Sequence, residues 1–189
     1  MKKEIITING GLGSGKSSTA DLIAKELGFK RFSSGDFFRQ VGLDLGLSIN
    51  EINKRAETDS KIDEMTDEKL RLLRNEKGIV IDSRTAYHWI PESFKVYLDL
   101  PPEIAKNRIL SSLKVEKLRQ QSENMSSAEE VYTKIIERFE SEQKRYWDLY
   151  KIKNTDKKNY DLIIDTNKNN LEQVVDIIVS EYKKWIVKN

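Results

Sequence analysis

The stretch TINGGLGSGKSSTADLIAKEL, residues 7–27, places four glycines in six positions and follows them with a lysine, two serines and a helical pattern. Glycine loses more conformational freedom on folding than any other residue, so this cluster has to serve backbone conformations that side chains would prevent. The run before it, at 4–9, is β-branched, and the run at 16–27 has apolar residues at helical spacing. We therefore expect a strand, a tight glycine loop and a helix.

The loop matches the pattern G-x-x-x-x-G-K-[ST] from Gly10 to Ser17. Glycines at these positions let successive backbone N–H groups point at a phosphate, and the helix that follows adds its positive end. We expect Lys16 to reach the β and γ phosphates and the Ser17 hydroxyl to bind Mg²⁺. The sequence thus predicts an ATP- or GTP-binding loop made of Gly10, Gly11, Leu12, Gly13, Ser14, Gly15, Lys16, Ser17 and Ser18.

Length and composition exclude several other classes of protein. The chain has 189 residues, which predicts one domain. Its 33 basic and 31 acidic residues nearly cancel, which argues against a nucleic-acid partner. It has no cysteine and one histidine, so disulfides, thiolate metal sites and a Ser-His-Asp triad are not expected. Because no apolar run is long enough to span a membrane, we expect a cytoplasmic protein with no membrane partner. We also expect a monomer.

Short apolar strands alternate with helical stretches along the chain. Such alternation is typical of parallel sheets, so we expect an α/β fold of the P-loop NTPase type, with a five-stranded parallel sheet and helices on both faces. The strands are expected at 4–9, 29–33, 79–82, 94–100 and 160–165. The helices are expected at 16–27, at 36–75, from Pro102 onward, from a doubled capping signal at Ser126 and Ser127 to about 150, and at 171–187.

Two motifs that follow predicted strands resemble those of nucleoside monophosphate kinases. FSSGDFFR, residues 32–39, is similar to the family's S-[TS]-G-[DE]-x-x-R segment, and IVIDSR, residues 79–84, is similar to its [DE]-G-x-R element. In that family the first segment touches the acceptor nucleotide and its arginine holds the acceptor phosphate, a task suited to a bidentate guanidinium. The resemblance implies acceptor contacts from Ser34, Gly35, Arg39 and Arg84 and a magnesium-orienting carboxylate at Asp82.

The same residues have structural alternatives. Arg39 could form a surface salt bridge, Asp36 could be a charge at a helix N-terminus, and Asp82 with Arg84 could form a strand-end salt bridge. The chain also departs from the family pattern, because Ser83 replaces the middle glycine and Thr85 stands where bacterial cytidylate kinases have an acidic residue that helps to read cytosine.

Within the family, the chain resembles the short archaeal-type cytidylate kinases from residue 4 to about 180. AETDSKID at 56–63, YLDLPPEIAKNRI at 97–109 and YDLIIDT at 160–166 are similar to stretches of that group. The resemblance implies that ATP phosphorylates a nucleoside monophosphate, CMP or dCMP, to give ADP and the diphosphate, with Mg²⁺ as the cofactor. It also implies one kinase domain, 1–189, with its core in 1–35, 76–107 and 151–189, an acceptor-binding insert at about 36–75 and a lid at about 108–150.

The stretch IIERFESEQKRYWDLY, residues 135–150, carries Arg138, Glu142 and Arg145 on one helix face. Its R-x-x-x-[DE]-x-x-R pattern resembles the lid-side helix of cytidylate kinases, in which the arginines close over the transferring phosphoryl group and the acidic residue contacts the acceptor. The alternative is a solvated ladder of salt bridges. A separate apolar stripe is expected to anchor the helix to the core, with Ile135, Phe139, Tyr146 and Tyr150 as its members.

These expectations combine into a phosphotransferase whose catalytic residues are Lys16, Arg84, Arg138 and Arg145, whose acceptor residues include Glu142, and whose magnesium ligands are Ser17 and Asp82. Two alternatives stay open at this point. One is a P-loop kinase for another small acceptor, and the other is a nucleotide-dependent switch NTPase that acts through a protein partner.

Overall fold

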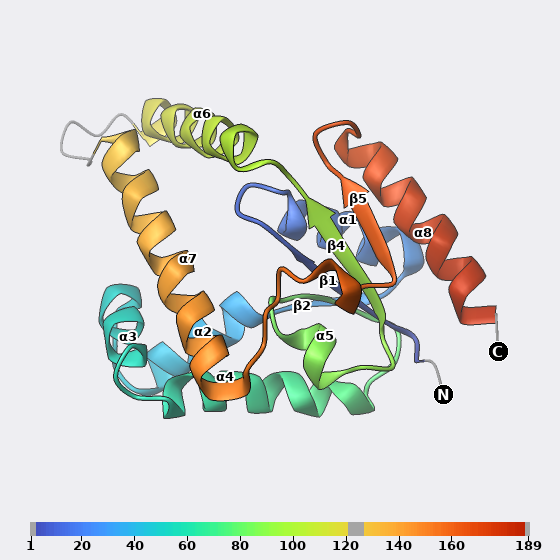
Figure 1. Ribbon diagram of the computed structural model, residues 1–189, viewed down its shortest axis with the longest axis horizontal. Helices are drawn as coiled ribbons and strands as arrows, with labels where there is room; N and C mark the ends of the chain where they lie inside the picture. The colour runs from blue at the N-terminus through green and yellow to red at the C-terminus, as the bar shows by residue number, and fades with distance from the viewer. Residues whose placement is uncertain (1–2, 121–126, 188–189) are drawn as a thin grey trace.

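The computed structural model describes residues 3–120 and 127–187, and it has an α/β architecture (Figure 1). In this part of the chain, five parallel strands form one sheet in the order β2-β3-β1-β4-β5. The predicted parallel sheet is therefore confirmed, and β1, which enters the glycine loop, lies at its centre. The strands are β1 (Ile5–Gly10), β2 (Lys30–Ser33), β3 (Ile79–Asp82), β4 (Phe94–Asp99) and β5 (Leu162–Asp165).

Helices cover both faces of the sheet, as predicted. On one face, α1 (Lys16–Leu27) and α8 (Leu171–Val187) pack against each other and against the strands. On the other face lie α4 (Lys61–Leu72) and the short α5 (Ala86–Trp89). Of these two helices, only α5 was not predicted from the sequence. Side chains of a strand alternate between the two faces, so neighbouring residues such as Ile5 and Ile6 belong to different apolar clusters.

The register of the central strands aligns their carboxyl ends. Ile8 of β1 and Ser33 of β2 both stand opposite Asp82 of β3. The glycine loop after β1, the start of α2 after β2 and the loop after β3 therefore leave the sheet at the same edge. In open α/β sheets, ligands bind at this edge.

The helical stretch predicted at 36–75 consists of separate helices rather than one. They are α2 (Ser34–Asp44), α3 (Ile49–Ala56), α4 and the 3₁₀ turn η1 (Leu73–Asn75). Gly46 has a φ of 68°, a left-handed conformation that ends the helical run after α2. Ser48 then caps α3 in a reciprocal capping box with Glu51, so the sequence itself specifies both the stop and the restart.

Beyond β4, α6 (Pro102–Gln120) and α7 (Ala128–Tyr150) form an arm that leaves the sheet and returns beside α2, α3 and α4 (Figure 1). The capping box expected at Ser127 is present with Glu130, whereas Ser126 lies outside the described residues. The polar stretch after residue 113 continues α6 to Gln120. The chain then passes through the 3₁₀ turn η2 (Lys157–Asn159) into β5. No described helix is apolar over a length that could cross a membrane.

Gly10 and Gly11 allow a direct test of the packing at the start of the loop. A Cβ on Gly10 would lie 2.5 Å from the Leu98 carbonyl oxygen and 2.7 Å from Ser14 Oγ, whereas one on Gly11 meets nothing within 4 Å. We expect Gly10→Ala to destabilise the protein by about 1–3 kcal/mol through overpacking. Gly11→Ala is the matched control and should stay within about 0.5 kcal/mol of the wild type in urea unfolding. Equal losses in both variants would contradict this account.

Candidate active site

The glycine loop presents backbone N–H groups at the start of α1. Gly13 and Gly15 have φ values of 66° and 85°, which side chains adopt at a cost. Gly15 is the residue before α1, and no side chain caps the helix there. The N–H groups of the first turn lack helical carbonyl partners and are directed toward the loop, where the helix end is also positive. The geometry suits an anion such as a phosphate.

Lys16 lies folded across the loop. Its Nζ donates to the carbonyl oxygens of Gly10 and Gly11, both at 2.9 Å. Burial and, to a smaller extent, the nearby charge of Arg84 lower the pKa of Lys16 to about 8, while Asp82 and Glu142 oppose the shift. The surroundings thus stabilise the positive charge of Lys16 only in part. An anionic ligand at the loop would stabilise it further.

Ser17 and Asp82 meet beside Lys16. Ser17 Oγ donates to Asp82 Oδ2 at 2.6 Å, and Asp82 is buried at the end of β3. A hydroxyl and a carboxylate are hard oxygen donors of the kind that Mg²⁺ prefers, so these residues fit the ion. In the described residues no cluster of three or more His, Cys, Asp or Glu side chains could hold a metal alone. Mg²⁺ usually binds through one or two protein groups and substrate phosphates.

A second polar site, named the acceptor cavity after the role predicted for its residues, lies between α2, α3, α4, α7 and the loop after β3. It has a volume of about 90 Å³. It brings together residues predicted from three separate motifs, and its lining includes Ser34, Gly35, Arg39, Arg84, Arg138, Glu142 and Arg145. The predicted acceptor residues therefore share one cavity, which the sequence could suggest only by resemblance.

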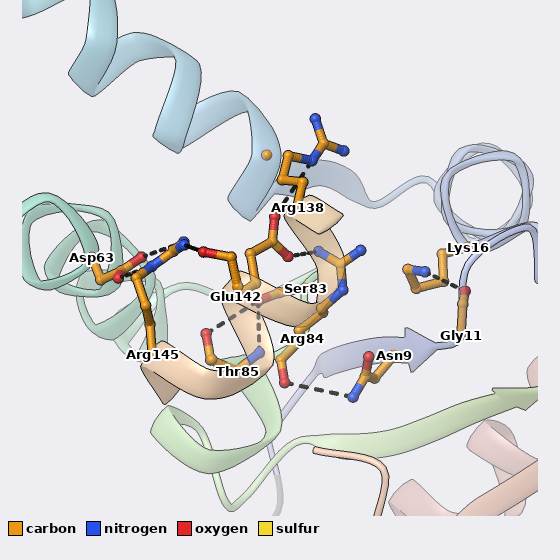
Figure 2. A network of polar contacts seen from close by, with 12 residues as sticks. Asn9, Gly11, Lys16, Asp63, Ser83, Arg84, Thr85, Arg138, Glu142 and Arg145 are labelled. Atoms are coloured by element: carbon orange, nitrogen blue, oxygen red, sulfur yellow. Dashed lines mark hydrogen bonds and ion pairs between the residues drawn. The ribbon is translucent and has the colours of Figure 1, made fainter. Parts of the chain in front are cut away.

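Arg84 connects the loop after β3 to α7. It forms an ion pair with Glu142, whose other carboxylate oxygen lies 3.7 Å from Arg138 Nε. The Arg84 guanidinium also lies 5.2 Å from the centre of the Phe139 ring. Figure 2 shows Arg84 and Arg138 approaching Glu142 from different sides. Glu142 thus holds two arginines at the cavity.

Arg145 is engaged differently from its neighbours on α7. It is buried, and its Nε and Nη2 donate to Asp63 of α4 at 2.7 and 3.4 Å, while Nη1 donates to Ser141 Oγ at 2.8 Å (Figure 2). Burial raises the pKa of Asp63, and the hydrogen bonds from Arg145 oppose that shift. Because Arg145 is buried against Asp63, the alternative of a solvated salt bridge is wrong for this residue. The sequence alone could not show that Asp63 of α4 lies opposite Arg145.

The apolar stripe on α7 anchors the helix both to the site and, at its Tyr150 end, to the apolar core. Phe139 packs under Arg84, and the Tyr150 ring lies 5.0 Å from that of Trp89 after β3. Ile135 lines a groove against α3, and Tyr146 lines the acceptor cavity. The expected anchoring to the core is present at the Tyr150 end of the stripe, because Trp89 packs against the apolar cluster that contains Ile79 and Ile81 of β3.

Thr85 replaces the family's acidic residue, and α4 supplies a carboxylate next to it. Thr85 Oγ1 donates to Asp67 Oδ1 at 3.0 Å, and both side chains are buried. Burial raises the pKa of Asp67 to about 6, which the Tyr150, Thr85 and Trp89 side chains oppose. Sequence reasoning missed Asp63 and Asp67. Their i, i+4 spacing on the buried face of a helix, beside Ile62 and Thr66, was the available signal.

A larger cavity of about 680 Å³ lies between the glycine loop and α6. Gly13 and Gly15 border it from the loop, and Ile104 and Arg108 border it from the helix. Arg108 Nη2 donates to the Thr166 carbonyl oxygen after β5 at 2.8 Å. No motif in the sequence predicted this cavity, because its walls come from two separate parts of the chain, the glycine loop and α6.

Comparison with known proteins agrees with this geometry. The model of the family described as "Cytidylate kinase-like family" matches residues 5–168. The chain belongs to the cytidylate kinase-like family. The prediction of a nucleotide-binding P-loop kinase is thereby confirmed at the level of the family.

Individual relatives cover this chain to different extents. A cytidylate kinase from Natronomonas pharaonis is 35% identical over 184 residues, which are 94% of this chain and 90% of that protein. An S-adenosylmethionine-dependent nucleotide dehydratase from Lacinutrix mariniflava is 35% identical over 185 residues, which are 96% of this chain but 36% of that protein. The chain therefore spans about a third of the length of the dehydratase.

Solved structures confirm the fold. A shikimate kinase from Acinetobacter baumannii in complex with shikimate aligns with a TM-score of 0.61 at 17% identity, over 98% of this chain and 96% of that one. At this identity the likeness concerns the fold, which is that of a P-loop kinase.

The lowered pKa of Lys16 predicts a pH dependence of nucleotide binding. Phosphates favour the charged ammonium, so the complex binds more protons than the free protein above pH 8, and affinity should fall as the pH rises past about 8. We expect calorimetric titration with Mg-ADP to show a loss approaching tenfold per pH unit up to about pH 9.5. Lys16→Arg keeps its charge and should remove this slope. An equal slope in the variant would assign the effect to another group.

Proposed function

We propose that the chain transfers the γ-phosphoryl group of ATP to a nucleoside monophosphate, with CMP or dCMP preferred. The observation that carries this proposal is the presence of two anion sites at one edge of the sheet. The glycine loop with Lys16 is one, and the acceptor cavity with its arginines is the other. The Asn9 side chain, directly before the glycine loop, donates to the Arg84 carbonyl oxygen at 3.5 Å (Figure 2), so the two sites adjoin.

The donor nucleotide is proposed to bind along the glycine loop. The loop from Gly10 to Ser18 holds the phosphates, with Lys16 at the β and γ phosphates. Ser17 and Asp82 would hold Mg²⁺, which would shield the phosphate charge during transfer. The cavity beside α6, bordered by Arg108, has room for the nucleoside of ATP.

The acceptor phosphate is proposed to bind between Arg39 and Arg84, with Ser34 and Gly35 at the start of α2. Glu142 then has two roles, because it holds Arg84 and Arg138 in place and borders the space for the nucleoside. Thr85 and Asp67 lie together behind Arg84 and give this part of the site a buried polar wall. Relatives named cytidylate kinase support CMP or dCMP as the acceptor.

The chemistry needs positioning and charge more than proton transfer, because a phosphate acceptor is already an anionic nucleophile. Lys16, Arg84 and Arg138 supply positive charge around the transferring group. Arg145 is proposed to join them only if it exchanges its contacts with Asp63 and Ser141; otherwise it holds α7 in position. The insert and lid boundaries, the cytoplasmic location and the monomeric state stay predictions.

A product assay over several acceptors tests the proposal. With ATP and Mg²⁺, CMP or dCMP should give the highest kcat/KM among nucleoside monophosphates, and shikimate should give no phosphorylated product. A reaction without acceptor controls for bare hydrolysis. A clear preference for AMP, GMP or TMP would contradict the proposed acceptor, and hydrolysis that no acceptor stimulates would favour a switch NTPase.

Substitution of the proposed acceptor arginines should separate the two substrates. Arg39→Ala and Arg84→Ala should each cost about 1.5–3 kcal/mol in kcat/KM for the monophosphate, because a charge-assisted hydrogen bond is lost, with little change in ATP affinity. Arg55→Ala is the control, because Arg55 forms an exposed pair with Asp59 on the insert. Equal losses of ATP and CMP affinity would mean that the arginines serve the donor site or the fold.

A further inference from the structure

Arg31 lies at the centre of a chain of ion pairs that joins the two anion sites. We propose that Arg31 is a positioning residue that couples the binding of the donor nucleotide to that of the acceptor, by passing the charge state of Asp82 through Asp36 to Arg39. The inference rests on the proposed function, since it takes Asp82 as part of the donor site and Arg39 as part of the acceptor site.

The Arg31 guanidinium is shared among three carboxylates. Its Nη2 lies 3.5 Å from Asp82 Oδ2, its Nη1 donates to Asp36 Oδ2 at 3.4 Å, and its Nε lies 3.2 Å from Asp21 Oδ1. Strong bonds between a guanidinium and a carboxylate are shorter, about 2.7–2.9 Å. None of the three carboxylates therefore holds Arg31 tightly, and a small change in charge at one of them shifts it toward the others.

Asp36 is shared in turn between two arginines. Its Oδ2 accepts from Arg31, and its Oδ1 accepts from Arg39 one helical turn later. Arg39 is exposed and lines the acceptor cavity, so the phosphate of an acceptor would compete with Asp36 for its guanidinium. The more Asp36 is neutralised by Arg31, the less firmly it retains Arg39.

The Asp82 end of the chain responds to the donor. Asp82 is buried, and its Oδ2 accepts from Ser17 and faces Arg31. A carboxylate that also neutralises a divalent cation has less negative charge left to attract Arg31. Arg31 then turns toward Asp36, and Arg39 becomes available to the acceptor phosphate. The order of contacts, from Ser17 through Asp82, Arg31 and Asp36 to Arg39, thus favours acceptor binding once the donor is bound.

The proposal is tested by measuring the affinity for CMP with and without saturating Mg-AMP-PNP, a nonhydrolysable ATP analogue, by calorimetry. The wild type should bind CMP at least about fivefold more tightly in the presence of the analogue, within the usual range of coupling between sites. Reciprocity requires that CMP tighten the analogue by the same factor, which checks each cycle internally.

Two variants should lose this synergy in opposite ways. Arg31→Gln leaves Asp36 to Arg39 alone, so CMP binding should stay weak with and without the analogue. Asp36→Asn releases Arg39, so CMP binding should be tight in both conditions. Both variants should still bind Mg-AMP-PNP, so that the synergy can be measured in each of them. Arg74→Gln is the matched control, because Arg74 pairs with Glu92 at the opposite edge of the sheet, and it should keep the full synergy.

Wild-type synergy in Arg31→Gln would overturn the proposal. The proposal would also be overturned if the wild type bound CMP equally tightly with and without the analogue. That result would leave the proposed acceptor intact. Failure of the wild type to bind CMP in either condition would overturn both the coupling and the proposed acceptor. If a substitution only disturbed folding, it would weaken CMP binding in both variants. Weak CMP binding in Arg31→Gln together with tight CMP binding in Asp36→Asn therefore separates the coupling from a folding defect.

Discussion

The alignment of Ile8, Asp82 and Ser33 at the carboxyl ends of β1, β3 and β2 is the constraint on which the rest of the site depends. It brings the glycine loop, the Asp82 carboxylate and the start of α2 to one edge of the sheet. Two mutually repelling anions can react only if the protein aligns them and neutralises their charge. In the proposed function, a parallel sheet with this register supplies the alignment, and the lysine and arginines that leave its edge supply the charge.

Charge also determines how α7 is held. Near the acceptor cavity the helix meets the rest of the protein through Arg84 with Glu142 and through Asp63 with Arg145, and not through the central apolar core. Removing one partner of a buried pair is costly, about 3–5 kcal/mol, so the pair of Asp63 and Arg145 fixes where α7 lies. The contact of Arg138 with Glu142 is longer, at 3.7 Å, and Arg138 is exposed, so this pair contributes little to stability.

Much of the fold followed from local signals in the sequence. The glycine loop, the helix at 16–27, the helix at 171–187 and the strand ending at Asp82 depend on spacing and capping within a few residues, and these predictions are confirmed. The order of the strands and the partners of Arg31, Arg108 and Arg145 depend on residues far away in the chain, so no local pattern could give them. Asp67 is the clearest example, because Thr85 departed from the family motif and only the packing of α4 placed a carboxylate beside it.

In the proposed function, the donor and acceptor phosphates occupy adjoining sites at one edge of the sheet. The most direct measurement is the inhibition pattern of a compound in which a pentaphosphate links adenosine to cytidine, since it can fill both sites only if they adjoin. The account predicts that the compound competes with both ATP and CMP and binds more tightly than either. Competition with ATP alone, at an affinity no greater than that of ATP, would contradict it.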